Sequence, residues 1–304
     1  MNMNFDDKVE FSFNFEIDED ESVVSRTLTE AEDYKDRNDG PVREAEENIL
    51  SSDHLQLIRS ELLPKAHTEV VSFHVKEKEH ISMTKLTIKA EEQLNNEQCS
   101  FAGDLKKTDL ISGVYEGGFK LWECAVDLVQ YLIDEKIEVD NKQVLEVGCG
   151  HGLPGIYCLI TGRGTKSHFQ DYNDEVVKFL TMPNLVLNDK DGRLASCASF
   201  FSGDWSLLEE YQDERGDQYD LILTSDTLYS SSSHSKLYKY MKRLLKPDGV
   251  IYLAAKTYYF GCGGGVRQFE SMVLDKAEMN ISTVHKIADG QSNMREILKI
   301  THKH

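Results

Sequence analysis

Several features are scarce or absent in this chain of 304 residues. Its six cysteines include no Cys-x-x-Cys pair, and histidines such as His151, His168 and His234 do not cluster at metal-ligand spacing. We therefore expect reduced thiols and no metal site. No apolar run reaches the roughly 20 residues of a membrane span, and the start of the chain lacks the charged-then-apolar order of a secretory signal. These absences predict no membrane contact and a location in the cytoplasm and nucleus, with the nucleolus as one option.

Positive charge is also scarce. The chain has 34 Lys and Arg residues against 53 Asp and Glu residues, which gives a formal net charge of -19. Proteins that bind the nucleic-acid backbone usually present a basic face to the phosphates. The sequence therefore argues against direct nucleic-acid binding and favours a basic protein partner. We expect the protein to be a monomer.

The negative charge is concentrated at the N-terminus. Residues 1–50 contain 16 acidic and 5 basic side chains, a composition typical of a disordered extension. Within it Phe11, Phe13 and Phe15 alternate as in a short strand or docking motif, although they could equally be incidental aromatics in a solvated tail. Residues 51–108 carry short apolar patches at 69–75 and 83–88, and their role is not indicated. We treat residues 109–304 as the main domain.

This domain alternates apolar runs with amphipathic stretches. Leu121, Ala125, Leu128, Val129 and Leu132 fall on one face of a predicted helix. The runs that predict strands are residues 144–147, 167–170, 196–201, 219–224 and 250–255. Strands and helices in this order are typical of an α/β domain with a parallel, helix-covered sheet.

The end of the domain has a different pattern. A helix is predicted at residues 266–276, and the apolar runs 281–287 and 294–301 follow with only a short turn at Asp289 and Gly290 between them. Because no helix separates the two runs, they predict an antiparallel hairpin that ends the sheet.

A glycine-rich loop follows the first predicted strand of the domain. Missing side chains there let backbone amides approach a ligand at the carboxyl edge of the sheet. Gly150, Gly152 and Gly155 fit the dinucleotide fingerprint, with Asp171 about 20 residues later as an acceptor for ribose hydroxyls. Taken alone, this spacing suggests a nicotinamide cofactor.

Three features favour another class. Glu146 lies inside the motif, Gly148 already supplies a glycine before Gly150, and the chain ends in the predicted hairpin. Together they resemble the seven-strand, Rossmann-like methyltransferase sheet. In that fold an acid after the second strand holds the ribose, which is the place of Asp171, and residues 203–205 would contact the adenine.

Five longer segments resemble the histidine-specific protein methyltransferase family: residues 109–124, 168–173, 200–205, 219–225 and 255–265. The resemblance covers nearly all of residues 109–301, and residues 11–18 are similar to that family's N-terminal segment. It implies transfer of a methyl group from S-adenosyl-L-methionine to a histidine ring nitrogen of a large-subunit ribosomal protein. Such a basic substrate would suit the acidity of this chain.

The resemblance also implies which residues line the cofactor: Lys120, Leu121, Trp122, Glu123, Cys124, Glu146, Gly148, Gly150, Gln170, Asp171, Tyr172, Gly203, Asp204, Trp205 and Ser225. Structural alternatives stay open for three of them. Asp171 could cap a helix, Trp205 could be plain core, and the Trp122 ring could only anchor its helix.

Asp226 and Tyr229 are the candidate catalytic residues. They occupy the acid-x-x-Tyr position that related protein methyltransferases carry beside the substrate, although histidine-specific members more often have Glu in place of Asp226. A carboxylate here could accept the second ring N–H of a target imidazole and fix its tautomer. Alternatively, Asp226 could cap the helix that follows it. Residues 261–265, rich in glycine, could flex as a lid or simply link two elements.

Chemistry explains why conspicuous catalytic groups are few. An imidazole is mostly neutral at pH 7, whereas freeing a lysine amine costs roughly 4 to 5 kcal/mol. Alternative functions are lysine methylation by the same fold and an inactive scaffold that binds cofactor and partner. Nicotinamide-dependent oxidoreduction would need a hydride-transfer site that we do not find in the sequence.

Overall fold

The computed structural model describes residues 43–65, 67–74, 80–87, 110–111, 113–290 and 292–303. The aromatic alternation at Phe11, Phe13 and Phe15 lies outside these residues, as does most of the acidic extension. The division of the chain at residues 50 and 108 stays a prediction.

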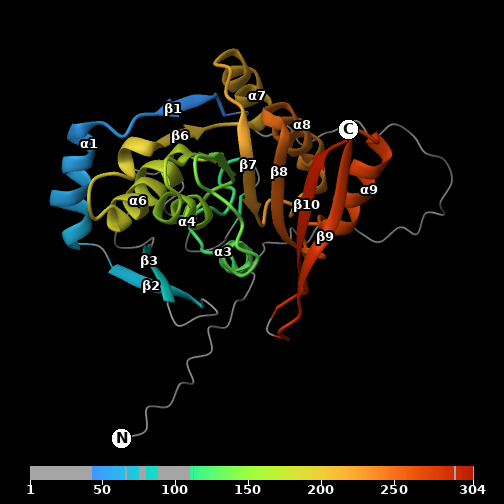
Figure 1. Ribbon diagram of the computed structural model, residues 1–304, viewed down its shortest axis with the longest axis horizontal. Helices are drawn as coiled ribbons and strands as arrows, with labels where there is room; N and C mark the ends of the chain where they lie inside the picture. Colours follow the sequence, from blue (N-terminus) through green and yellow to red (C-terminus); the bar gives the residue numbers. More distant parts are fainter. Residues whose placement is uncertain are drawn as a thin grey trace, which may run out of the picture.

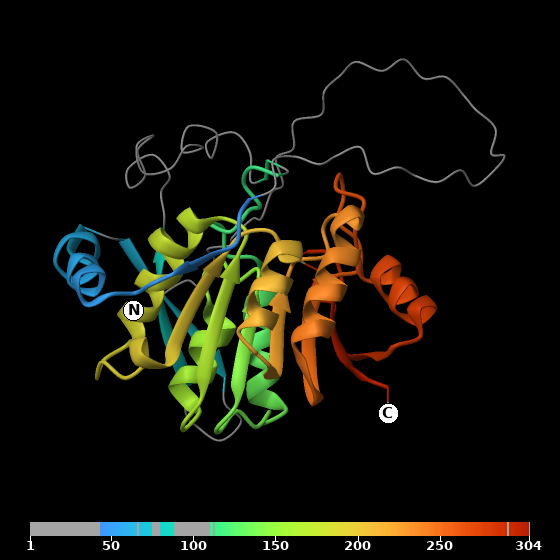
Figure 2. The same ribbon diagram turned by 90° about the horizontal axis from the view of Figure 1, so that it is seen from above.

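One eight-stranded sheet forms the centre of the molecule (Figures 1 and 2). Its strands, in spatial order, are β1 (Glu46–Asn48), β6 (Ala198–Ser202), β5 (Lys166–Asp171), β4 (Gln143–Val147), β7 (Tyr219–Ser225), β8 (Leu245–Lys256), β10 (Arg295–His302) and β9 (Met279–Ile287). The five strands from β6 to β8 run parallel to one another, whereas β1, β10 and β9 pair antiparallel with their neighbours. The predicted parallel sheet and its closing hairpin are confirmed.

Most strand ends lie within one or two residues of the prediction, and the starts of β6 and β8 have identifiable reasons for their shifts. β6 begins at Ala198 rather than residue 196, because residues Ala195–Cys197 form the short turn η5. β8 begins at Leu245, five residues early, since Tyr219 pairs with Leu245 before the register shifts to Leu221 and Val250.

Helices cover both faces of the sheet. One layer holds α3 (Glu123–Asp134), α4 (Leu153–Thr161) and α6 (Met182–Asn188), and the other holds α7 (Trp205–Glu214), α8 (His234–Leu244) and α9 (Val266–Lys276). Along β4, Val144 packs into the first layer, whereas Leu145 and Val147 pack into the second. Burial of each such side chain contributes about 1.5–3 kcal/mol. Both faces being apolar explains the unbroken apolar runs in the sequence.

Short helical segments complete the connections. They are α5 (Asp174–Val176), η4 (Val177–Thr181) and η6 (Ser231–Ser233). α3 confirms the predicted amphipathic helix: it buries Cys124, Ala125, Leu128, Val129 and Leu132, while Leu121 lies just before its first residue. No helix in the described ranges is long and apolar enough to cross a membrane.

The N-terminal segments pack against this domain. α1 (Ser52–Leu57), η1 (Ile58–Leu62) and η2 (Leu63–Lys65) precede a two-stranded hairpin of β2 (His67–His74) and β3 (His80–Thr87). Ile58, Phe73 and Met83 are buried in the same core as α3 and α4. In Figure 1 the hairpin lies beside α3 and α6, so the described part of residues 51–108 covers one helix layer.

Candidate active site

The glycine-rich loop lies between β4 and α4, where the sequence predicted it. Gly150 has φ +47°, a left-handed conformation that favours glycine. A Cβ atom on Gly150 would also lie 3.0 Å from the carbonyl oxygen of Gly118. The loop therefore needs glycine at position 150 both for its backbone angle and for the close approach of Gly118.

Asp171 fixes this loop from the end of β5. Its Oδ2 accepts a hydrogen bond from the Gly150 N–H at 3.0 Å, and its Oδ1 accepts one from the Asn173 N–H at 3.1 Å. Burial raises the pKa of Asp171 to about 6. Each carboxylate oxygen can still accept a further hydrogen bond, so Asp171 has capacity for ribose hydroxyls, and this role stays a prediction.

Gln170 joins three of the predicted residues into one network. Its Oε1 accepts hydrogen bonds from the Gly148 N–H at 3.2 Å and from Trp205 Nε1 at 2.8 Å, and its Nε2 donates to the Gly203 carbonyl at 3.1 Å. Trp205 is partly buried, and its indole N–H is oriented by Gln170 rather than by solvent. The carboxyl ends of β4, β5 and β6 are thereby fixed relative to one another.

Glu146 lies beneath the loop rather than facing outward from it. The side chain is 2% exposed, and its Oε2 accepts a hydrogen bond from the Gly155 N–H at 2.7 Å. Burial raises the pKa of Glu146 to about 8, with the Asp171 carboxylate acting in the same direction. The carboxyl group is therefore mostly neutral at pH 7 and supports the first turn of α4.

The start of α3 brings a second predicted group to the site. Trp122 precedes the helix and donates from Nε1 to the Gly117 carbonyl at 3.0 Å, and Lys120 Nζ lies 4.5 Å from the centre of the Trp122 ring. The carboxylate oxygens of Glu123 are buried without a hydrogen-bond partner in the described part of the chain. One of them, Oε2, forms an ion pair with Lys256 Nζ at 3.0 Å that lacks hydrogen-bond geometry.

Asp226 has partners for both of its carboxylate oxygens. Oδ2 accepts the Cys124 N–H at 3.1 Å, and Oδ1 accepts the Tyr259 hydroxyl at 2.6 Å. Burial raises the pKa of Asp226 above its usual value, whereas the nearby Lys256 ammonium lowers it. Asp226 thus caps the start of α3, a helix about 100 residues earlier, and not the helix that follows it. Its catalytic role stays a prediction.

Tyr229 lies next to a carboxylate that the sequence analysis did not single out. Its hydroxyl donates to Glu116 Oε2, and the Gly113 N–H donates to Glu116 Oε1 at 2.6 Å. The Glu116 backbone N–H in turn donates to Asn173 Oδ1 at 3.0 Å. Glu116 lies in segment 109–124 of the family resemblance, which was the available signal, but spacing alone could not pair it with a residue 113 positions away.

The remaining predicted residues lie around the same edge. The Tyr172 hydroxyl donates to the Gly113 carbonyl at 3.1 Å, and Asp204 caps α7 by accepting the Ser206 N–H. Ser225 ends β7, paired in register with Ala254. Leu121 packs against the core of the α3 layer rather than extending this network.

Residues 43–48 approach the site from outside the predicted domain. The Arg43 guanidinium forms ion pairs with Asp174 and Glu175 at 3.0 and 2.9 Å and donates to the Val114 carbonyl at 3.2 Å. A Cβ atom on Gly203, whose φ is +122°, would lie 2.2 Å from the Glu44 carbonyl oxygen. The glycine at the adenine position is therefore required by the chain that passes over it.

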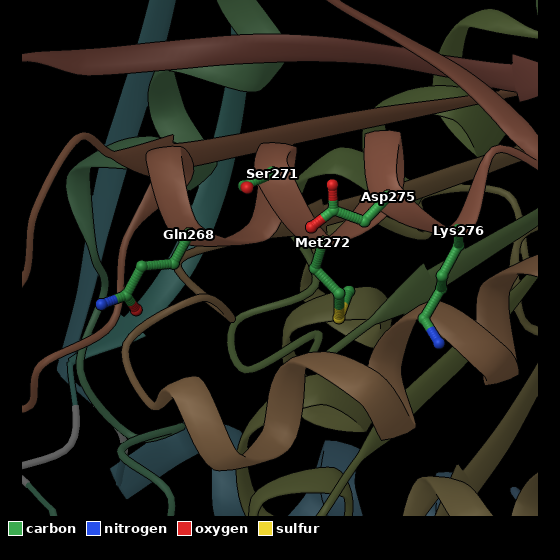
Figure 3. A pocket seen from close by; sticks show the side chains of 5 residues that line it. All are labelled: Gln268, Ser271, Met272, Asp275 and Lys276. Atoms are coloured by element: carbon green, nitrogen blue, oxygen red, sulfur yellow. The ribbon is translucent and has the colours of Figure 1, made fainter. Parts of the chain in front are cut away.

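A separate surface hollow has no connection with these groups. It is lined by Gln268, Ser271, Met272, Asp275 and Lys276, all from α9 (Figure 3). None of the predicted site residues lines it. In the described ranges, no three His, Cys, Asp or Glu side chains are arranged to hold a metal ion.

The site residues fit S-adenosylmethionine. The buried Glu123 oxygens suit an ammonium group, Asp171 suits the ribose hydroxyls, and the glycine loop leaves its backbone accessible at the sheet edge. Fold and site together define the class of S-adenosylmethionine-dependent methyltransferases, whose seven-strand sheet is extended here by β1 as an eighth strand. Residues 110–262, half of the chain, match the profile of a family described as "Lysine methyltransferase", and the chain belongs to this family.

Two similar proteins are named as histidine protein methyltransferases. A "Histidine protein methyltransferase 1 homolog" of Dictyostelium discoideum is 51% identical over 66% of this chain and 62% of its own length. The protein of the same name from Bos taurus is 38% identical over 65% of this chain and 58% of its own length. The chain thus spans about three fifths of these relatives. Among solved structures, a magnesium protoporphyrin IX methyltransferase from Synechocystis is 14% identical, with a TM-score of 0.45. The match covers 58% of this chain and 81% of that structure's chain.

Proposed function

We propose that this protein is an S-adenosylmethionine-dependent methyltransferase that modifies a histidine ring nitrogen of another protein. The observation that carries the proposal is the 51% identity to a protein named as a histidine protein methyltransferase. Residues 110–262, which match the family profile, include the hydrogen-bond network that links the ends of β4, β5 and β6.

When bound, the cofactor would supply a methyl group already activated on a sulfonium. The residues would then have to hold it, exclude water and align the nucleophile, and such positioning can supply up to about 7 to 11 kcal/mol. Asp171 would bind the ribose, the Gln170 and Trp205 pair would shape the adenine side, and Glu123 would face the amino-acid end. A histidine suits this site because its imidazole is mostly neutral at pH 7.

We further propose a basic substrate, a large-subunit ribosomal protein, reached in the cytoplasm or nucleus by a monomeric enzyme. The net charge of -19 supports this choice, since a positive substrate is attracted over long range. The same charge is unfavourable for direct contact with ribosomal RNA.

Lysine is the second candidate target. The family description names it, and a "Protein N-terminal and lysine N-methyltransferase" of Cryptococcus neoformans is 31% identical over 42% of this chain and 43% of its own length. Because this relative has a lower identity and a shorter overlap than the histidine protein methyltransferase, we favour histidine over lysine as the target.

One experiment separates the two targets. The purified protein is incubated with large-subunit ribosomal proteins and S-adenosylmethionine carrying an isotope-labelled methyl group, and the products are hydrolysed for amino-acid analysis. Label in methylhistidine supports the proposal, and label only in methyllysine overturns it. A reaction with excess S-adenosylhomocysteine serves as the control, and no labelled residue of either kind would favour an inactive scaffold.

A further inference from the structure

A second carboxylate at the site is better placed for the substrate than Asp226. Both oxygens of Asp226 are used inside the fold, one by the N-terminus of α3 and one by Tyr259. An imidazole N–H that competed for them would weaken the cap on α3. A residue that does not cap a helix can therefore bind the target ring with less loss of folding stability than Asp226.

Glu116 meets this condition. It lies in the loop before α3, and its carboxylate accepts one backbone N–H, from Gly113, and one hydroxyl, from Tyr229. A hydroxyl proton can rotate away at little cost, so Oε2 can exchange or share the Tyr229 bond for an incoming N–H. Tyr229 itself belongs to the acid-x-x-Tyr motif that related protein methyltransferases carry beside the substrate.

The backbone around Glu116 is fixed at the site. The Glu116 N–H is bound by Asn173 Oδ1 at 3.0 Å, and the next carbonyl, from Gly117, accepts the Trp122 indole N–H at 3.0 Å. A Cβ atom on Gly118 would lie 3.2 Å from Asp171 Oδ2. The loop that carries Glu116 thus lies against Asp171 at the end of β5, and the Glu116 carboxylate contacts the tyrosine after β7.

We propose that Glu116 is a further catalytic residue, whose carboxylate accepts the N–H of the target imidazole nitrogen that is not methylated, with the Tyr229 hydroxyl beside it. This inference rests on the proposed histidine methylation. It assigns to Glu116 the tautomer-fixing role that the sequence suggested for Asp226.

The proposed step needs no oxidant, reductant or further reactant. The free imidazole nitrogen forms a bond to the methyl carbon, and the methyl carbon–sulfur bond breaks with its electron pair staying on sulfur. The ring then carries the positive charge, which the adjacent Glu116 carboxylate stabilises. The proton on the other ring nitrogen passes to Glu116 and from there to solvent, which leaves a neutral methylhistidine and a thioether.

The electrostatic surroundings of Glu116 support this role. Burial raises the pKa of Glu116, the Asp204 carboxylate acts in the same direction, and the hydrogen bonds from Tyr229 and Gly113 oppose them. The titratable groups that interact electrostatically with Glu116 are Asp171 and Tyr172 at the end of β5, Asp204 after β6, Tyr229 after β7 and Cys262 after β8. A carboxylate in such acidic surroundings gains from meeting a cationic ring.

The test compares Glu116→Gln with wild type on large-subunit ribosomal proteins. Glutamine keeps an acceptor for the Gly113 N–H but cannot take the ring proton. We expect kcat for methylhistidine formation to fall about 100-fold, while the affinity for S-adenosylhomocysteine, measured by calorimetry, stays within a factor of about 2. Glu210→Gln, an exposed carboxylate-to-amide change on α7, is the matched control and should behave as wild type.

A pH profile separates catalysis from a structural role. In wild type both Glu116 and the target imidazole must lose a proton, so log(kcat/KM) should rise with a limiting slope of about 2 at low pH, against about 1 in Glu116→Gln. Glu116→Asp, which keeps the carboxylate, should recover part of kcat and the steeper slope. This recovery also guards against a folding defect in the glutamine variant.

The outcomes are distinct. Wild type that forms methylhistidine while Glu116→Gln is equally active overturns the role of Glu116 and leaves the proposed function standing. Loss of S-adenosylhomocysteine affinity in Glu116→Gln would make Glu116 a cofactor ligand and overturn the inference as well. Wild type that binds S-adenosylhomocysteine but forms no methylhistidine overturns the proposed function, and this inference with it.

Discussion

Glu146 is a buried acid whose protonation should make folding stability depend on pH in a defined window. Its pKa is about 8 in the folded protein, against an ordinary value of 4.5, because the carboxyl group is almost fully removed from water. A folded-state pKa above the unfolded one means that the native protein binds the proton more tightly. The stabilisation is therefore complete below about pH 4.5 and is lost as the pH rises towards 8.

The magnitude follows from the shift in pKa. Relative to its stability below about pH 4.5, the folded protein loses up to about 5 kcal/mol well above pH 8 and roughly 3 kcal/mol at pH 7, because only the unfolded chain ionises Glu146 freely. These are upper values, because the Gly155 N–H would bind the ionised carboxylate more strongly and water can enter. Glu146→Gln keeps an oxygen acceptor for Gly155 and cannot ionise, so it should remove this loss.

The measurement is the free energy of unfolding in urea at several pH values from 6.5 to 9, for wild type and Glu146→Gln. We expect the variant to become more stable relative to wild type by 1 kcal/mol or more, roughly, across this window. Asp171, with a pKa of about 6, is already mostly ionised there and contributes little to the difference. A stability difference that stays constant from pH 6.5 to 9 would refute a neutral, buried Glu146.

Three further predictions concern the loop, the helix cap and the covering strand. Asp171→Asn should weaken S-adenosylhomocysteine binding about 10- to 100-fold by calorimetry, and wild-type affinity should fall as the pH drops below about 6; unchanged affinity would remove Asp171 from the site. Asp226→Ala should lower the free energy of unfolding in urea by about 2–4 kcal/mol, because two buried donors lose their acceptor. If Asp226→Asn is as stable as wild type but loses most of its kcat, Asp226 has a catalytic role after all. Gly203→Ala should cost at least about 2 kcal/mol more than Gly216→Ala, since both have positive φ but only Gly203 faces backbone at 2.2 Å; equal costs would mean that residues 43–48 do not press on it.

The regular part of the fold could be predicted from the sequence because its physics is local. Strands buried on both faces become apolar runs, and α3 places its apolar residues at helical spacing, so both leave a periodic signal. Helix α9 was predicted at its observed bounds, residues 266–276, for the same reason. β1 left no such signal, since three residues are too few for a periodicity.

Polar contacts between distant segments could not be predicted in this way. Asp226 was placed correctly at the end of a strand, but its hydrogen bond to the Cys124 N–H joins residues 102 positions apart. The contacts of Arg43 with Asp174 and of Tyr229 with Glu116 span similar distances along the chain. No spacing rule connects such pairs, so the sequence indicated which strand ends carry chemistry but not which side chain each residue meets.

Residues 113–118 link the cofactor side of the site to the substrate side. Asn173 donates from Nδ2 to the Val114 carbonyl at 2.7 Å and accepts from the Glu116 N–H, so the loop is bound to the end of β5. Tyr229 binds the same loop from the end of β7, and its partner there is the Glu116 side chain. Asn173 is hydrogen-bonded both to Asp171 and to the Glu116 N–H. A ligand that binds Asp171 should therefore reduce the motion of residues 113–118, and with it the motion of the Glu116 side chain, before a substrate binds. Order of binding should therefore be cofactor first, and initial-rate kinetics with S-adenosylhomocysteine as inhibitor should be competitive with cofactor and non-competitive with substrate. A substrate that binds equally well without S-adenosylhomocysteine would show that the loop is already set.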